Sequence, residues 1–243
     1  MNNPISEKAQ AELAPGGKLR VGVNLGNFLL VNKDPASGEL RGIVPDLAQE
    51  LAMRLGATVE LIGYPGAGQV ADAAATGAWD VGFIGAEPQR AAVIEFTLAY
   101  VEIPATYLVP AGSAIRTLDE VDRPGIRIAT SARSAYDLYL SRSLKHATLV
   151  RAEGLPASYD LFVKEKLDAL SGLLPRLTAD VARLPGARIL DGRFTAIQQA
   201  IGTPKARTAG AAYLRDFVAE IKSSGLVAKL IARHGVKGIS VAP

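Results

Sequence analysis

The chain has 243 residues, of which 49 % are hydrophobic and 21 % are charged, and this suits two modest α/β lobes or one large domain. Its net charge of +3 is spread along the sequence without a basic stripe, so nucleic acid is not an expected partner. The sequence has no cysteine, which excludes disulfides, thiolate catalysis and cysteine-ligated metals. No apolar run reaches the roughly 18–20 residues of a membrane span.

Strands and helices alternate in the first hundred or so residues. Short β-favouring apolar runs bounded by turn signals predict strands at residues 19–23, 58–62 and 80–84. Helical spacing of apolar residues predicts helices at residues 45–55 and 70–75. Strands that are separated by helices imply right-handed crossovers and a parallel sheet.

The same alternation restarts after about residue 112. The strands expected in this second part are residues 125–129, 148–150, 169–172 and 188–190. The expected helices are residues 134–144, 157–165 and 209–234, the last with a break at 223–225. The repeated α/β unit predicts two similar lobes.

Two apolar connectors join the lobes, at residues 103–109 and 194–201. Both resemble strands more than flexible linkers, which would be polar and rich in Gly and Ser. The chain therefore leaves lobe 1, builds lobe 2 and returns, and paired crossings of this kind form a hinge that can close around a ligand in the cleft. The predicted boundaries are 18–107 with 200–243 for lobe 1, 108–199 for lobe 2, and 1–17 for an N-terminal extension.

Arg90 follows the expected strand at residues 80–84 after a short loop. Pro88 can open a helical turn in that loop, because its missing N–H is not needed there. Arg90 is thus expected just past the carboxyl end of a parallel strand, where open α/β sheets bind ligands. A guanidinium at such a place matches a carboxylate with two parallel hydrogen bonds. The alternative is a solvated arginine on a helix surface.

Several segments in order resemble a known family. They are residues 20–23 (RVGV), 42–48 (GIVPDLA), 55–57 (LGA), 80–90 with 96–100 (FTLAY), 166–169 (KLDA), 203–205 (TPK) and 224–226 (SGL). Over roughly residues 18–236, the chain resembles type II periplasmic solute-binding proteins of the polar amino-acid branch, family 3, which are the capture subunits of ABC importers. The resemblance implies a two-lobed α/β fold of the periplasmic-binding-protein-like type II, with mostly parallel sheets flanked by helices.

The resemblance also assigns ligand contacts. In this family, the arginine that matches Arg90 binds the carboxylate of the ligand. The start of the first helix in lobe 2 adds backbone N–H groups, and here Ser134 and Ala135 occupy that place. Elementary physics agrees, since a helix N-terminus favours an anion. Plain N-capping by Ser134 is an alternative that is compatible with this role.

The chain departs from the family at three places. Relatives that bind α-amino acids have an aspartate where this chain has Leu173, so an ammonium would lack its usual partner. Gly85 is among the residues that replace the usual hydroxyl residues before the arginine; Glu87 either supplies the missing anion or faces solvent. Arg133 stands where the family prefers glycine, either as a second anion partner or as a solvated residue at the helix start.

The loop after the first expected strand also faces the predicted cleft. Phe28 matches an aromatic residue that is frequent there in the family. Asn24 and Asn27 offer amide donors and acceptors to polar parts of a ligand. Turn chemistry beside Gly26 is the alternative role for both asparagines.

No catalytic or metal-binding constellation is visible. His146 and His234 are far apart in the sequence and neither neighbours a candidate nucleophile, and the motifs HExxH, GxxxxGK and GxSxG are absent. We therefore expect no enzyme, no cofactor and no metal. One alternative is a cyclohexadienyl-dehydratase-like enzyme, although its catalytic acid would fall near Leu173. Another is the ligand-sensing module of a receptor.

The sequence thus predicts a periplasmic binding protein that captures a small carboxylate-bearing molecule, either an amino acid or an organic acid. The resemblance implies an ABC permease at the membrane as its partner, and we expect a monomer. No secretory signal is visible at the start of the sequence, so this location requires that the signal peptide has been removed.

Overall fold

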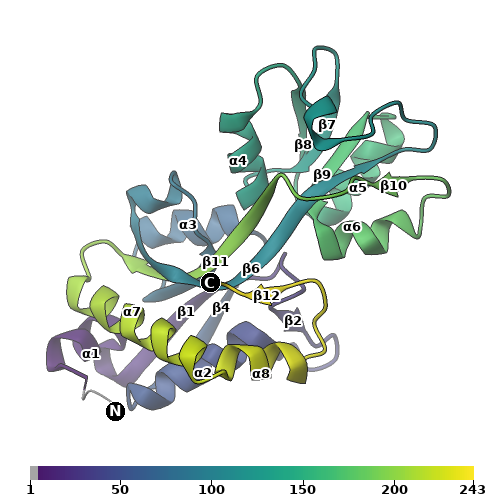
Figure 1. Ribbon diagram of the computed structural model, residues 1–243. Helices are drawn as coiled ribbons and strands as arrows, with labels where there is room; N and C mark the ends of the chain where they lie inside the picture. Colours follow the sequence, from purple (N-terminus) through teal and green to yellow (C-terminus); the bar gives the residue numbers. More distant parts are fainter. Residues whose placement is uncertain (1–4) are drawn as a thin grey trace. The chain divides into compact units, whose positions relative to one another are not determined.

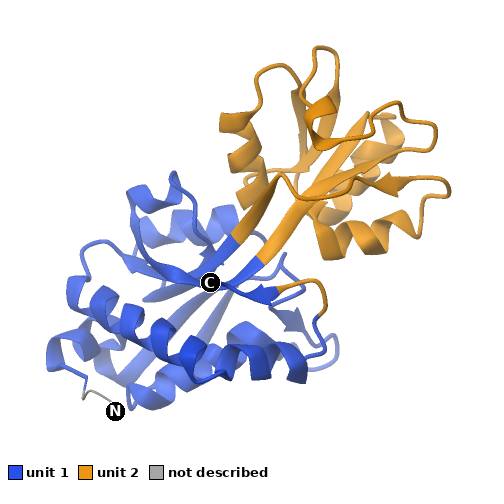
Figure 2. Cartoon of the chain, in the orientation of Figure 1, with its two compact units in different colours: residues 1–102, 198–236, 240–243 blue, residues 103–197, 237–239 orange. Residues whose placement is uncertain are grey.

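The computed structural model describes residues 5–243, so the first four residues of the predicted N-terminal extension lie outside it (Figure 1). The chain divides into two compact units (Figure 2). Unit 1 contains the residues up to 102 together with 198–236 and 240–243, and unit 2 contains 103–197 and 237–239. Each unit combines strands and helices, which confirms the predicted α/β class.

Unit 1 is built on a mostly parallel sheet. Its strands, in spatial order, are β4 (Thr58–Tyr64), β1 (Lys18–Asn24), β5 (Val81–Gly85), β11 (Thr195–Pro204), β6 (Ile94–Val109) and β12 (Ser240–Val241). Strand β1 pairs in parallel with both β4 and β5. Strand β11 runs antiparallel to β5, because it brings the chain back from unit 2.

The helices of unit 1 are α1 (Glu7–Leu13), α2 (Ile43–Arg54), α3 (Ala67–Ala75), α7 (Thr208–Ser223) and α8 (Leu226–Arg233). Helices α2 and α3 pack on the parallel strands, while α1 packs on α7. The predicted break in the last helical stretch is confirmed at Gly225, whose φ of 76° lies in the left-handed region that suits glycine. A small hairpin of β2 (Asn32–Lys33) and β3 (Leu40–Arg41) completes this unit.

Trp79 fills a slot between two neighbouring strands. Gly22 of β1 and Gly82 of β5 are register partners. A methyl group on Gly22 would lie 2.7 Å from the Trp79 ring, and one on Gly82 would lie 3.0 Å from it. The indole is fully buried and its N–H donates to the carbonyl of Val70 at 2.9 Å. The absence of both side chains therefore lets the indole lie directly against the sheet.

A buried carboxylate holds the beginning of β5. Asp80 is fully buried, and it accepts from the Arg20 backbone and guanidinium, at 2.8 Å from Nη2, and from Arg207 Nη1 at 2.6 Å. The same Arg207 nitrogen donates to the carbonyl of Glu12 in α1 at 2.7 Å. Because a buried charge requires such partners, this network ties β1, β5, α1 and the start of α7 together.

Unit 2 is a sheet with helices on both faces. Its strands, in spatial order, are β10 (Arg188–Ile189), β6, β9 (Ala169–Leu173), β7 (Arg127–Ser131) and β8 (Thr148–Ala152). Its helices are α4 (Ala135–Ser143), α5 (Leu155–Lys164) and α6 (Leu174–Val181). One apolar cluster joins the sheet to α4 through Leu140, and a second joins it to α5 and α6 through Phe162 and Leu177.

Strands β6 and β11 carry the chain between the units (Figure 2). β6 is 16 residues long and β11 is 10, so both predicted connectors are strands. At the crossing, in unit 1, Gln198 Nε2 donates to Glu102 Oε2 at 3.2 Å. Among residues 5–243, none of the helices combines the length and apolarity needed to cross a bilayer.

Candidate functional site

Arg90 lies at the carboxyl end of β5 in unit 1. All five residues of β5 are buried, and the chain then turns through a single 3₁₀ turn, Arg90–Ala92. The Arg90 side chain folds back so that Nη1 donates to the carbonyl of Gly85 at 2.6 Å. Arg90 is only 4 % exposed, so it is not a solvated surface residue. The strand end and the turn together hold a guanidinium where parallel sheets bind ligands.

The loop that carries Arg90 is anchored on both sides. The backbone N–H of Ala86 donates to the carbonyl of Gln198 in β11 at 2.8 Å. Glu87 is buried as well, at 8 % exposure, and its carbonyl accepts from the N–H of Ala91 at 2.9 Å. Glu87 therefore does not face solvent, and its carboxylate belongs to the buried interior near the end of β5.

The two asparagines of the first loop in unit 1 have different environments. Asn24 Oδ1 accepts from the N–H of Gly26 at 3.0 Å, so this side chain is engaged in turn chemistry. Asn27 is 6 % exposed, and its Oδ1 has no hydrogen-bond partner among residues 5–243. Phe28 is 38 % exposed, so part of its ring is accessible. Asn27 and Phe28 thus retain unused polar and apolar surface.

In unit 2, Ser134 is the N-cap of α4. Its backbone is extended, and its Oγ accepts from the N–H of Asp137 at 3.1 Å. Ala135 is the first residue of the helix and is buried. The helix therefore starts at the carboxyl end of β7, with its N-terminal dipole directed at that edge of the sheet.

Asp137 organises the segment before the helix. Its Oδ2 accepts from the backbone N–H of Arg133 at 2.8 Å, and Arg151 Nε lies 2.9 Å from its Oδ1. Arg133 has a φ of 58°, which is the left-handed conformation that favours glycine. The preference of the family for glycine at this position thus has a backbone reason. Sequence reasoning missed Asp137, although an acid three residues after a serine N-cap is a recognisable signal.

Leu173 ends β9 and precedes α6 in unit 2. It is 6 % exposed, its register partner in β6 is Ala105, and it supplies no charge. The end of this strand therefore offers no carboxylate for an ammonium.

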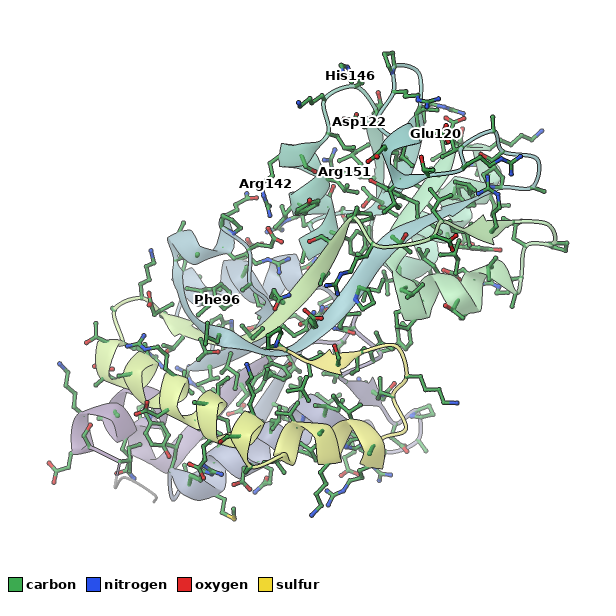
Figure 3. All side chains as sticks on the ribbon, viewed as in Figure 1. Phe96, Glu120, Asp122, Arg142, His146 and Arg151 are labelled. Carbon is green, nitrogen blue, oxygen red and sulfur yellow. The ribbon has the colours of Figure 1, made fainter. Side chains whose placement is uncertain are left out.

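The two histidines have structural contacts. The backbone N–H of His146 donates to Asp122 at 2.8 Å (Figure 3), and His234 Nε2 lies 2.9 Å from Asp46 Oδ2. Within the part of the chain that the structure describes, no three His, Asp or Glu side chains gather as a metal site.

The predicted site residues fall into two groups. Unit 1 holds Asn24, Asn27, Phe28, Gly85, Glu87 and Arg90, and unit 2 holds Arg133, Ser134, Ala135 and Leu173. In each unit, these residues follow strands at or near their carboxyl ends. Each group therefore lies at the carboxyl ends of strands, where α/β sheets generally bind ligands.

Solved structures share this fold. A mutant of ArgBP from T. maritima has a TM-score of 0.76 at 22 % identity, covering 93 % of this chain and 98 % of that one. A putative ABC-transporter binding component from Wolinella succinogenes, complexed with lysine, has a TM-score of 0.76 at 22 % identity, covering 90 % and 95 %. An ancestral amino acid-binding protein, a precursor of cyclohexadienyl dehydratase, has a TM-score of 0.75 at 21 % identity, covering 92 % and 98 %.

The fold is thus that of the two-lobed solute-binding proteins. Residues 19–237 match the bacterial extracellular solute-binding proteins, family 3, and the chain belongs to this family. Among curated proteins, none matches this sequence closely enough to be reported. Membership in the family confirms the resemblance drawn from the sequence and supports a role in solute binding.

Proposed function

We propose that the chain captures a small carboxylate-bearing molecule, an amino acid or an organic acid, and delivers it to an ABC permease from the periplasm. The observation that carries this proposal is the buried Arg90, held at the end of β5 by its bond to Gly85. A buried guanidinium favours an oxyanion that it can bind with two parallel hydrogen bonds. The family of the chain and the amino acids bound by similar structures support the same class of ligand.

In this proposal, both units contribute to one ligand. Arg90 binds the carboxylate, the backbone N–H of Ala135 at the start of α4 donates to it, and Ser134 adds its hydroxyl hydrogen, since the Ser134 N–H already bonds to the carbonyl of Ser131. Strands β6 and β11, which carry the chain between the units, serve as the hinge that closes on the ligand. Asn27 and Phe28 shape the rest of the site. Leu173 leaves the ammonium of an amino acid to other acceptors, such as Asn27 Oδ1 or Glu87.

The proposal is tested by calorimetry with L-arginine, L-glutamate and succinate. Replacing Arg90 by alanine is expected to weaken binding of the compound that binds the wild type by about 2–4 kcal/mol, because a buried charge pair is lost. Arg142→Ala is the control, since Arg142 stacks on Tyr139 at 5.4 Å in unit 2 and has no proposed ligand role. Equal affinity of Arg90→Ala and wild type would contradict the proposal.

We also propose that the chain is not an enzyme. Leu173 stands where a dehydratase of this fold would carry its acid, so a proton donor is missing there. Incubation with prephenate or arogenate should give no product. Formation of product at a rate above that of a heat-denatured sample would revive the dehydratase alternative.

A further inference from the structure

We propose that the hydroxyl of Tyr136 is a ligand-binding group, which donates a hydrogen bond to the anionic oxygen that the start of α4 holds. This inference rests on the proposed capture of a carboxylate and names a specificity-determining residue for it. Tyr136 is the second residue of α4 and lies in unit 2.

The Tyr136 hydroxyl is buried without a partner. The residue is 2 % exposed, and its oxygen makes no hydrogen bond with any described residue. The hydroxyls of Ser131 and Ser134 are its nearest polar neighbours and lower its pKa as weak hydrogen-bonding groups, but neither meets the distance and angles of a full hydrogen bond. A buried hydroxyl without a partner costs free energy, so its retention at this place requires an explanation.

The same helix start offers two further donors. Two amides of this first turn have partners. The side-chain Oγ of Ser134 accepts from the N–H of Asp137, and its backbone carbonyl accepts from the N–H of Leu138. The backbone N–H groups of Ala135 and Tyr136 donate to no group among residues 5–243. Both residues are buried. Two amides and one hydroxyl are thus left at the positive end of one helix dipole, which is the donor set of an anion site.

The hydroxyl is suited to donate. In helices, long side chains point back toward the N-terminus, and the nearness of Ser131 and Ser134 places the Tyr136 oxygen at the N-cap. Burial, the largest influence, raises the pKa of Tyr136 to about 12, so the oxygen keeps its proton at neutral pH. An acceptor that arrives with the ligand would take the hydroxyl proton. The hydroxyl oxygen could also accept from an ammonium, but the positive end of the helix dipole disfavours a cation at this place.

The test removes only the oxygen. Tyr136→Phe is expected to weaken the binding of whichever of L-arginine, L-glutamate or succinate binds the wild type by roughly tenfold or more, as expected for a lost hydrogen bond to a charged group. Tyr100→Phe is the matched control. Tyr100 is fully buried in β6, its hydroxyl also has no partner among the described residues, and it does not lie at a helix start.

Both phenylalanine variants should be at least as stable as the wild type in urea, because each loses a buried hydroxyl without a partner. Affinity within twofold of the wild type for Tyr136→Phe overturns the proposal. Equal weakening by Tyr100→Phe also overturns it, since the effect would then come from packing in general.

Inorganic sulfate tests whether the start of α4 binds an anion, and it does so without knowledge of the natural ligand. In an NMR titration, sulfate should cause saturable shifts in the amide resonances of Ala135 and Tyr136, with a Kd several-fold higher in Tyr136→Phe. Absent shifts at these amides, or an unchanged Kd, overturn the proposal. If sulfate binds in this way while none of the three carboxylates does, Tyr136 keeps its assigned role and the proposed function fails instead.

Discussion

Arg133 holds a backbone conformation that most side chains avoid. Its φ of 58° costs about 1–2 kcal/mol for a residue with a Cβ, and it persists because the carboxylate of Asp137 fixes the Arg133 N–H at 2.8 Å. Asp137 is itself held by Arg151. The Asp137 carboxylate thus holds a strained residue directly before the N-cap of α4.

Replacing Arg133 by glycine should raise the free energy of unfolding by about 0.5–1 kcal/mol. Relief of the left-handed strain exceeds the added entropy of glycine in the unfolded chain. Urea denaturation measures the effect. Lys166→Gly is the matched control, because Lys166 has a φ of 49° outside the proposed site. Both variants should gain stability, while a change in ligand affinity is expected for Arg133→Gly alone. A loss of stability in Arg133→Gly would contradict the strain argument.

The sequence could identify residues whose role is local. Ser134 was predictable as an N-cap because serine before a helix is a strong signal, and Arg90 because it follows a strand. The burial of Arg90 and its bond to Gly85 were not predictable, since they depend on how the loop folds back. Tyr136 gave no signal at all, because only packing decides whether a tyrosine hydroxyl has a partner.

At the scale of elements, most strands and helices were predictable from their apolar runs. The strand predicted at residues 58–62 is β4 (Thr58–Tyr64), and the helix predicted at 45–55 is α2 (Ile43–Arg54). Helices α1 and α6 were missed, because each has only seven or eight residues and gains its stability from packing on a neighbour rather than from its own propensity. Strand β6 begins at Ile94, ahead of the predicted connector at 103–109, and its extra length lies beside β11 and β12 in the sheet of unit 1.

The slot for Trp79 leads to a prediction about two strands. Gly22→Ala should destabilise the protein by about 1–3 kcal/mol, because the new methyl group would lie 2.7 Å from a buried ring that cannot move aside. Trp79 is the only tryptophan in the chain, so its fluorescence maximum should also shift to longer wavelength. Gly172→Ala in β9 is the control and should destabilise less, since its methyl group would meet the aliphatic side chain of Leu177 at 3.0 Å rather than a rigid indole at 2.7 Å. Equal stability and unshifted emission in Gly22→Ala would contradict this account.

At the scale of the whole molecule, the sequence indicated two α/β units joined by two strands, because the α/β pattern restarts and both connectors are apolar. It could not indicate which backbone groups would be satisfied by side chains from distant segments. Asp122, for example, accepts N–H groups from Lys145, His146 and Ala147 at 2.8–2.9 Å, more than twenty residues further along. Such long-range caps affect the stability of the chain as a whole.

Three carboxylates should make the protein sensitive to acid. Backbone N–H bonds, from Ser37 and from Arg116 respectively, lower the pKa of Asp34 below 3.8 and that of Glu120 below 4.5. Burial opposes ionisation of Asp122, but its three N–H bonds outweigh this and lower its pKa below 3.8. A lowered pKa in the folded state contributes stability that is present above the unfolded value and is lost as the pH falls through the folded value.

The melting temperature should therefore stay level from about pH 7 to 5 and fall below about pH 4.5, where these groups begin to take up protons. Asp122→Asn should lower the melting temperature at pH 7 and reduce the further loss in acid, because one of the three contributions is already gone. Asp119→Asn, at an exposed neighbouring position, is the control and should follow the wild-type curve. Thermal unfolding in buffers of constant ionic strength measures both curves. A wild-type melting temperature that stays level down to pH 3 would show that these N–H bonds do not stabilise the folded state.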